Sequence, residues 1–250
     1  MKHKAIFLFN LTRIMVDKWL DAGVECWMYD GQHEPGIHPD ADEPNLIRVG
    51  RMFDADNSIR EAARIAEEVG PGVIFVASFA ECTDLTCTGA RWWEAKRKKD
   101  PRFQEKAVAL AKMVKHVAEF CSVENGSFEP ASTVPWMLEN PKISRLSTMW
   151  RPCDHWFHPY NFGGYLPEDH QHSLYPEIYP ARDAYPKQTG IWCGGGFKMP
   201  EHKSVPAVKD NPGWSKLGGS STRTKNIRSA TPEGFAVAVF IYNATPIAPF

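Results

Sequence analysis

Two residues in this sequence have the types and positions needed for nucleophilic and acid chemistry. Cys82 follows the apolar segment 73–78 and precedes small polar residues. An exposed thiol at such a strand end, near cations, ionises at neutral pH and acts as a nucleophile. Glu139 opens the tripeptide Glu139-Asn140-Pro141 and is a candidate acid. The simpler alternatives are a small buried residue for Cys82 and a turn-capping carboxylate for Glu139.

Alternating strand-like and helix-like segments predict the scaffold that positions these residues. Apolar runs without helical spacing predict strands, whereas apolar residues three and four apart predict helices. The strands are expected at 5–9, 24–29, 46–49, 73–78 and 134–138, and the helices at 15–22, 58–69 and 103–121. This alternation predicts an α/β fold with a doubly wound, mostly parallel sheet.

The C-terminal part of the chain has weaker periodicity. Residues 150–230 are rich in Pro, Gly, His and aromatic residues, which predicts a loop-rich functional decoration with one strand at 188–192. Thr231 and Pro232 favour a helix over 232–243, with a strand as the alternative because of its β-branched residues. We expect a single domain over 1–250, with its core at about 1–150 and 187–250 and a loop-rich insertion at about 151–186.

Ligands of open parallel sheets bind beyond the carboxyl ends of the strands. The first strand is followed by Phe9, Asn10 and Thr12, and the second ends at Asp30. A carboxylate at the second position is the usual partner of ribose hydroxyls. These four residues are therefore candidates for a nucleoside-containing cofactor.

Five ordered motifs carry a resemblance to a known family. They read FAECTDLTCTGARWW (79–93), ENP (139–141), HPYNFGG (158–164), KQTGIWCGGGFKMP (187–200) and RSATPEGFAVAVF (228–240). In order and spacing the chain resembles the cytosine-5 DNA methyltransferase superfamily, and most closely short phage-encoded relatives without a target-recognition domain. The resemblance implies a Rossmann-like class I methyltransferase fold.

The resemblance also implies roles for the candidate residues. Cys82 would add to carbon 6 of a pyrimidine, and Glu139 would hold and protonate ring nitrogen 3, so that carbon 5 attacks a one-carbon electrophile. S-adenosylmethionine is the implied donor. Its site would be lined by Phe9, Asn10, Thr12 and Asp30, and the pyrimidine or a phosphate would be held by Asn140, Arg91, Lys187 and Thr189.

Departures from the family pattern leave two alternatives open. No glycine occurs in residues 1–22, where the superfamily has a glycine-rich turn against its cofactor, and Gly50-Arg51 stands where Gly-Asp is frequent. This favours a folate donor and a hydroxymethyl product as one alternative. Glu81 replaces the proline before the nucleophile and opposes formation of its thiolate. A catalytically inactive module that binds a nucleotide or a protein is the other alternative.

Charge and composition bound the partners. The 250 residues have a formal net charge of −1, which argues against strong non-specific binding to nucleic acid. Two segments are nevertheless basic, 96–115 with eight Lys/Arg against two Asp/Glu and 202–228 with six against one. The partner is expected to be DNA or a pyrimidine nucleotide. The sequence leaves open whether the substrate is a polymer or a monomer, and it leaves the oligomeric state open.

Location and metal content are also expectations at this stage. The chain lacks an apolar run of about 18 residues, so we expect no membrane partner and a cytoplasmic location, in the host if the gene is a phage gene. The six cysteines include no CxxC pair. One His- and Cys-rich cluster fits no metal-ligand spacing, so we expect no metal there. Its members are Cys153, Asp154, His155, His158, His170 and His172.

Overall fold

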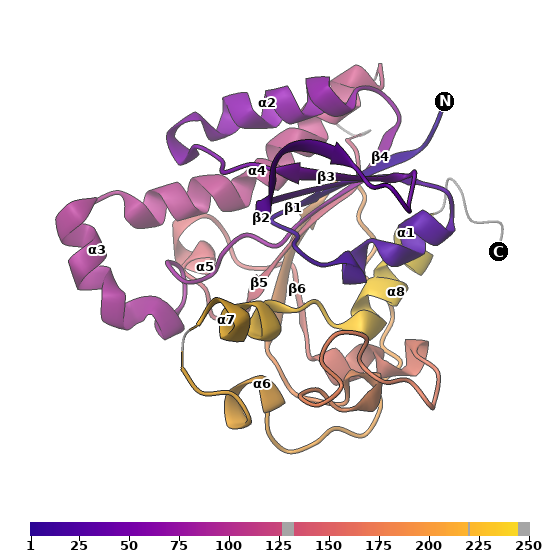
Figure 1. Cartoon of the computed structure of the whole chain (residues 1–250). Coiled ribbons are helices and arrows are strands. Elements are labelled where there is room, and N and C mark those ends of the chain that lie inside the picture. The colour runs from indigo at the N-terminus through magenta and orange to yellow at the C-terminus, as the bar shows by residue number, and fades with distance from the viewer. Residues whose placement is uncertain (127–132, 220, 245–250) are drawn as a thin grey trace.

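Seven strands form one sheet in the computed structural model, which describes residues 1–126, 133–219 and 221–244, without the side chain of Thr88 (Figure 1). Their order across the sheet is β3-β2-β1-β4-β5-β7-β6. The strands are β1 (Lys4–Leu8), β2 (Glu25–Pro39), β3 (Leu46–Gly50), β4 (Val73–Ser78), β5 (Trp136–Pro141), β6 (His155–Phe157) and β7 (Thr189–Gly194).

The sheet has the predicted, mostly parallel direction. β1 pairs in parallel with β2 and β4, and β4 pairs in parallel with β5. β7 is antiparallel to both of its neighbours, β5 and β6. The α/β doubly wound fold is thus confirmed, and the carboxyl ends of β1, β4 and β5 lie at one edge, together with Asp30, where the parallel part of β2 ends.

Helices cover both faces of the sheet. α1 (Asp17–Asp21) and α8 (Glu233–Asn243) pack on one face, and α2 (Ser58–Val69) and α4 (Phe103–Glu124) pack on the other (Figure 1). The remaining α-helices in the described residues are α3 (Trp93–Lys99), α5 (Leu146–Met149), α6 (Pro212–Ser215) and α7 (Thr222–Ser229). No helix in the described residues has the length and apolar character needed to cross a bilayer.

The structure corrects the sequence prediction most clearly at β2. A loop is expected after Asp30, but β2 extends to Pro39 and folds back, so that Ile37, His38 and Pro39 meet β3 in reverse order. This returning segment is polar and exposed because it forms an outer edge, where prolines and polar side chains are tolerated. β6 and the helices α3, α5, α6 and α7 were also not predicted, because each is too short for a periodic signal.

The helix predicted at 232–243 is confirmed as α8, and its N-terminus is anchored by a buried acid. Gly234 approaches the neighbouring 3₁₀ helix so closely that a Cβ would lie 2.4 Å from the carbonyl oxygen of Phe162. Oδ2 of Asp183 accepts a hydrogen bond from the Gly234 amide at 2.7 Å. Oδ1 of Asp183 is buried and has no hydrogen-bond partner among the described residues. Burial raises the pKa of Asp183 to about 7.

We expect Asp183 to make stability fall as the pH rises. Its pKa is above the unfolded value of about 4, so its contribution is complete at acidic pH and is lost as the pH rises through about 7. The full effect is on the order of 4 kcal/mol. In D183N, the free energy of unfolding should therefore fall less between pH 5 and pH 8.5 than in the wild type. Denaturant titrations across this range test this, and parallel curves for the two proteins would contradict it.

Candidate functional site

The loop after β4 holds Cys82 in a defined turn. The carbonyl oxygen of Cys82 accepts hydrogen bonds from the Leu85 amide at 2.9 Å and from Oγ1 of Thr86 at 3.0 Å. Gly89 closes the loop, and a Cβ at this position would lie 1.7 Å from the carbonyl oxygen of Thr83. Only glycine allows this close approach of two backbone segments.

Neighbouring elements fix the same loop from outside. Asn140 on β5 donates from Nδ2 to the carbonyl oxygen of Ala80 at 2.9 Å. Gln104 on α4 donates to the carbonyl oxygen of Asp84 at 3.0 Å, and the amide of Arg145 donates to that of Leu85 at 2.7 Å. Because a loop tied to three elements has few alternative conformations, Cys82 is held in place before any ligand binds.

Glu139 lies within β5, near the carboxyl end of the strand, rather than in the turn expected after it. Its backbone pairs with Ile191 on β7, and the residue is 7% exposed. Burial raises the pKa of the Glu139 carboxyl, while the positive charge of Lys187 lowers it in part. Glu139 is therefore a buried acid that holds its proton above the usual pH range of a glutamate.

Cys82, Glu139 and Lys187 form one electrostatic cluster. Burial raises the pKa of the Cys82 thiol most, and the Glu139 carboxylate raises it further. The ammonium of Lys187 and the hydrogen bond with Thr86 lower it. A protonated Glu139 removes the repulsion but leaves the attraction of Lys187, so a neutral Glu139 and a Cys82 thiolate favour each other.

Glu81, the acidic neighbour of Cys82, points toward solvent. It is exposed, and its Oε1 accepts a hydrogen bond from Oγ1 of Thr83 at 2.7 Å. It raises the pKa of Cys82 less than Glu139 does. The negative charge of Glu81 therefore disfavours the Cys82 thiolate, as the sequence predicts, but only weakly.

Two residues position the backbone of Lys187. Its amide donates to Nδ1 of His158 at 3.0 Å, and its carbonyl oxygen accepts from Oγ1 of Thr189 at 3.4 Å. Thr189 is fully buried at the start of β7. In this structure Thr189 therefore supports Lys187 and is not exposed toward a ligand.

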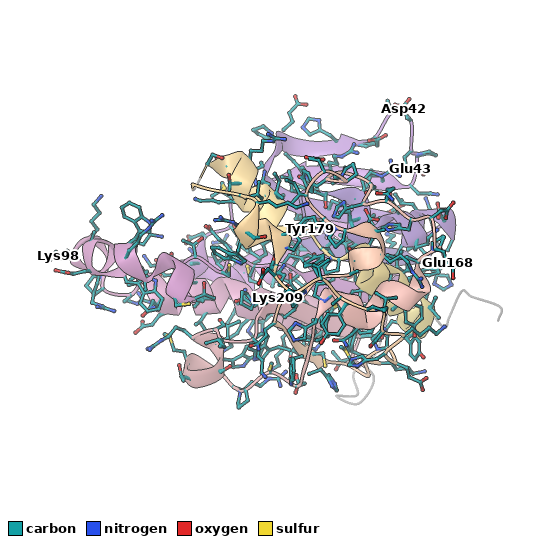
Figure 2. All side chains as sticks on the ribbon, turned by 90° about the horizontal axis from the view of Figure 1, so that it is seen from below. Asp42, Glu43, Lys98, Glu168, Tyr179 and Lys209 are labelled. Carbon is teal, nitrogen blue, oxygen red and sulfur yellow. The ribbon has the colours of Figure 1, made fainter. Side chains whose placement is uncertain are left out.

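The other predicted substrate residues lie in different surroundings. Asn140 is 2% exposed, and its Oδ1 has no hydrogen-bond partner among the described residues. This leaves a buried acceptor beside Glu139. Arg91 is exposed on the surface, with its guanidinium 5.0 Å from the centre of the Trp92 ring. Arg91 is not among the groups that shift the pKa of Cys82 most. The following helix α3 projects from the body of the protein, with Lys98 near its tip (Figure 2).

The residues predicted to bind the cofactor lie just after β1 and at Asp30, where the parallel part of β2 ends. Phe9 has φ 53°, the left-handed conformation that favours glycine. The amide of Asn10 donates to the carbonyl oxygen of Tyr29 at 3.0 Å, and Asn10 is 4% exposed. Thr12 precedes a short 3₁₀ helix, and Oδ1 of Asp30 accepts from the Gln32 amide at 2.8 Å. The structure brings these four residues to one end of the sheet.

The sequence analysis missed Phe53, which completes the apolar wall of this region. Its ring packs edge-on against Phe9, with centroids 5.3 Å apart, and lies 6.1 Å from the ring of Tyr29. Phe53 follows the end of β3 by three residues. Its position after a strand end was the available signal. Nearby, Nη2 of Arg51 donates to Glu68 at 2.6 Å, and Nη1 of Arg51 is buried without a partner among the described residues.

The His- and Cys-rich cluster is divided between separate contacts. Asp154 pairs with Arg151 at 2.5 Å, His170 pairs with Glu233, and His158 accepts from Lys187. In the described part of the chain, no three His, Cys, Asp or Glu side chains are grouped as metal ligands would be.

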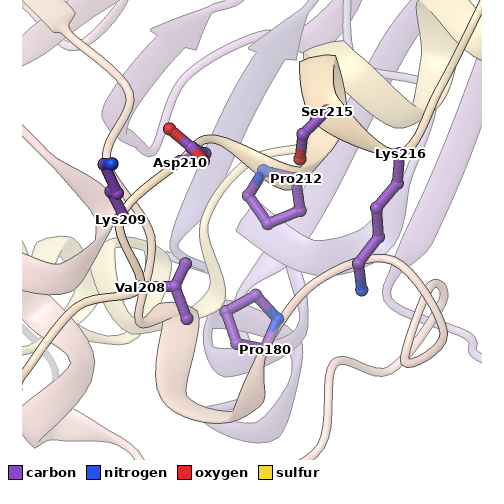
Figure 3. A pocket seen from close by; sticks show the side chains of 7 residues that line it. All are labelled: Pro180, Val208, Lys209, Asp210, Pro212, Ser215 and Lys216. Carbon is purple, nitrogen blue, oxygen red and sulfur yellow. The ribbon is translucent and has the colours of Figure 1, made fainter.

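One pocket of about 270 Å³ lies between Pro180 and α6 (Figure 3). Lys209, Asp210 and Lys216 line its rim, and Nζ of Lys216 donates to the carbonyl oxygen of Ile178 at 2.9 Å. None of its lining residues belongs to the predicted site. The candidate site is therefore defined by its buried side chains and not by this pocket.

The comparisons with known proteins add no relative. The chain matches no protein-family model and no curated protein. The arguments for its function therefore come from the residues and their geometry.

Proposed function

We propose that this protein is a pyrimidine carbon-5 one-carbon transferase, a cytosine-5 methyltransferase that uses S-adenosylmethionine. The observation that carries the proposal is the electrostatic cluster of Cys82, Lys187 and the buried Glu139 at the carboxyl end of the sheet. It unites a nucleophile, a protonated acid and a cation. The resemblance of the motifs around Cys82 and Glu139 to cytosine-5 methyltransferases supports the same reaction.

The three side chains have complementary tasks in this reaction. Lys187 stabilises the thiolate of Cys82, which attacks carbon 6 of the ring. The ring electrons move toward nitrogen 3, where protonated Glu139 donates its proton, and carbon 5 becomes nucleophilic. After methyl transfer, loss of the carbon 5 proton to water, expulsion of the Cys82 thiolate from carbon 6 and return of the nitrogen 3 proton to Glu139 would complete the reaction. The free Oδ1 of Asn140 is suited to accept a hydrogen bond from an amino group such as that of cytosine. When bound, S-adenosylmethionine supplies the electrophilic methyl group.

The residues near the ends of β1 to β3 fit the nucleoside part of this donor. Oδ1 of Asp30 is used by the Gln32 amide, and the second oxygen of the carboxylate is suited to a ribose hydroxyl. Phe9 and Phe53 offer aromatic surface to an adenine ring. Arg51 has a buried nitrogen that no described residue uses.

A folate donor is the second candidate, and Phe9 is the observation that favours it. The resemblance implies glycine in the turn after β1, whereas Phe9 adopts the left-handed conformation there and adds an aromatic ring. The side chain of Phe9 fills the space that a glycine would leave for the backbone to approach S-adenosylmethionine. Its ring can instead pack against the planar heterocycle of a folate. The product would then carry a hydroxymethyl group.

Isothermal titration of the purified protein with S-adenosylmethionine and its demethylated product tests the donor. We expect a micromolar Kd, followed by transfer of tritiated methyl groups to cytosine in DNA. Absence of binding would overturn the proposed donor. In that case, adduct formation by Cys82 with a 5-fluoropyrimidine would retain the folate alternative, and its absence would indicate a catalytically inactive binding module.

A further inference from the structure

Apart from the support that His158 gives to the backbone of Lys187, the motif HPYNFGG has no role in the proposed chemistry. Two of its rings, His158 and Tyr160, lie in a row with Trp156 at the end of the sheet. Trp156 lies on β6, His158 follows this strand, and Tyr160 lies in the 3₁₀ helix Pro159–Tyr165 that comes next. The ring centroids of Trp156 and His158 are 5.6 Å apart, and those of His158 and Tyr160 are 5.1 Å apart at an interplanar angle of 11°. We call these three residues the aromatic row.

The aromatic row is connected to the candidate site in two ways. Trp156 pairs with Gly190, which pairs with Asn140, so the three backbones form one line across β6, β7 and β5. With strands about 4.8 Å apart, Trp156 lies roughly 10 Å from the strand that carries Glu139. His158 also accepts the hydrogen bond of the Lys187 amide. Because of the backbone pairing, Trp156 lies on the same face of the sheet as Asn140.

The exposure of Trp156 and the positive charge of Lys142 favour binding of a nucleic acid strand to the aromatic row. Trp156 is 46% exposed on the edge strand β6. Nζ of Lys142 lies 3.6 Å from the centre of the Trp156 ring, so a cation stands at one end of the row. Asp154, which directly precedes β6, is paired with Arg151. Burial and Lys142 lower the pKa of His158, which keeps the ring neutral and suited to stacking.

We propose that the aromatic row is a stacking site for an unpaired base next to the target pyrimidine. The substrate is then a single-stranded or locally unpaired polynucleotide and not a mononucleotide. Stacking on exposed aromatic rings with cations for the phosphates is the general mode of single-strand binding. The location of the neighbouring base rests on the proposed function, but the binding of a strand to the row is measurable without any reaction.

Fluorescence anisotropy with a fluorescein-labelled oligo(dT) of 12 nucleotides tests the stacking site. We expect W156A to weaken binding about tenfold, in line with the loss of one stacked base. W156F, which keeps an aromatic ring, should stay within about threefold of the wild type. A duplex of the same length should show little difference between W156A and the wild type, because its bases are already stacked.

W214A is the matched control. Trp214 on α6 is 54% exposed and also has a cation over its ring, Arg228 at 4.2 Å, but it lies outside the aromatic row. Equal binding by W156A and the wild type, an equal loss in W156A and W214A, or no binding of the strand by the wild type would each overturn the stacking site. These outcomes are independent of the 5-fluoropyrimidine adduct at Cys82, whose absence would overturn the proposed function instead.

Discussion

Replacing Cys82 by alanine is expected to abolish methyl transfer and the covalent adduct with DNA that contains 5-fluorocytosine. The thiolate is the only group in the proposed mechanism that bonds to the ring, so its removal should lower the rate by at least about 10³-fold. The change removes a single sulfur from a half-buried side chain, so the fold should persist. The adduct is measured by denaturing gel electrophoresis and by the mass of the modified peptide.

Cys87 offers the matched control for this experiment. It lies in the same loop and is exposed, whereas Cys82 is half-buried and interacts electrostatically with Glu139. We expect C87A to form the adduct at the wild-type rate. An adduct that persists in C82A, or that maps to Cys87, would contradict the assignment of the nucleophile.

Replacing Glu139 by glutamine is expected to reduce the rate about 10²- to 10⁴-fold without unfolding the protein. Glutamine has nearly the same shape but cannot transfer a proton to nitrogen 3. The buried carboxyl has a raised pKa, so it is active as an acid in its protonated form. The rate of the wild type should therefore fall as the pH rises through the pKa of Glu139, and this fall should be absent in E139Q. Rate measurements across the pH range, together with thermal unfolding, test both points.

The control for Glu139 is E81Q. Glu81 is the exposed carboxylate next to Cys82, and it raises the thiol pKa only weakly. Removing its charge should leave the rate unchanged or slightly higher. If E139Q kept the wild-type rate and pH profile, Glu139 would be a structural residue and the proposed acid would be wrong.

The main elements of the fold were predictable because their periodicity is local. α2 was predicted at the boundaries that the structure shows, 58–69, because its apolar pattern is complete and is followed by Gly70. β4 was predicted at 73–78 because it is an apolar run that directly follows Gly72. The return of β2 along β3 was not predictable. Its polar segment is stabilised by hydrogen bonds to a strand that follows later in the chain, and residue types alone do not encode such a partner.

The helix α3 was not predicted for a different reason. None of its residues is buried, so no apolar face marked it, and the sequence showed only a run of cations. The projection of this helix from the body follows from the absence of an apolar face (Figure 1). The spacing of apolar residues does not predict short, exposed helices of this kind.

The sequence by itself determined the α/β alternation, the strand ends that carry Phe9, Asp30 and Cys82, and the motif around Glu139. These follow from local patterns, since a parallel sheet brings the carboxyl ends of its strands together whatever the loops do. Only the tertiary structure decided the states of the side chains. It buried Glu139, moved Lys187 next to Cys82, turned Glu81 toward solvent and left Arg91 on the surface. Protonation depends on burial and neighbouring charges, and both are set by contacts between residues far apart in the chain.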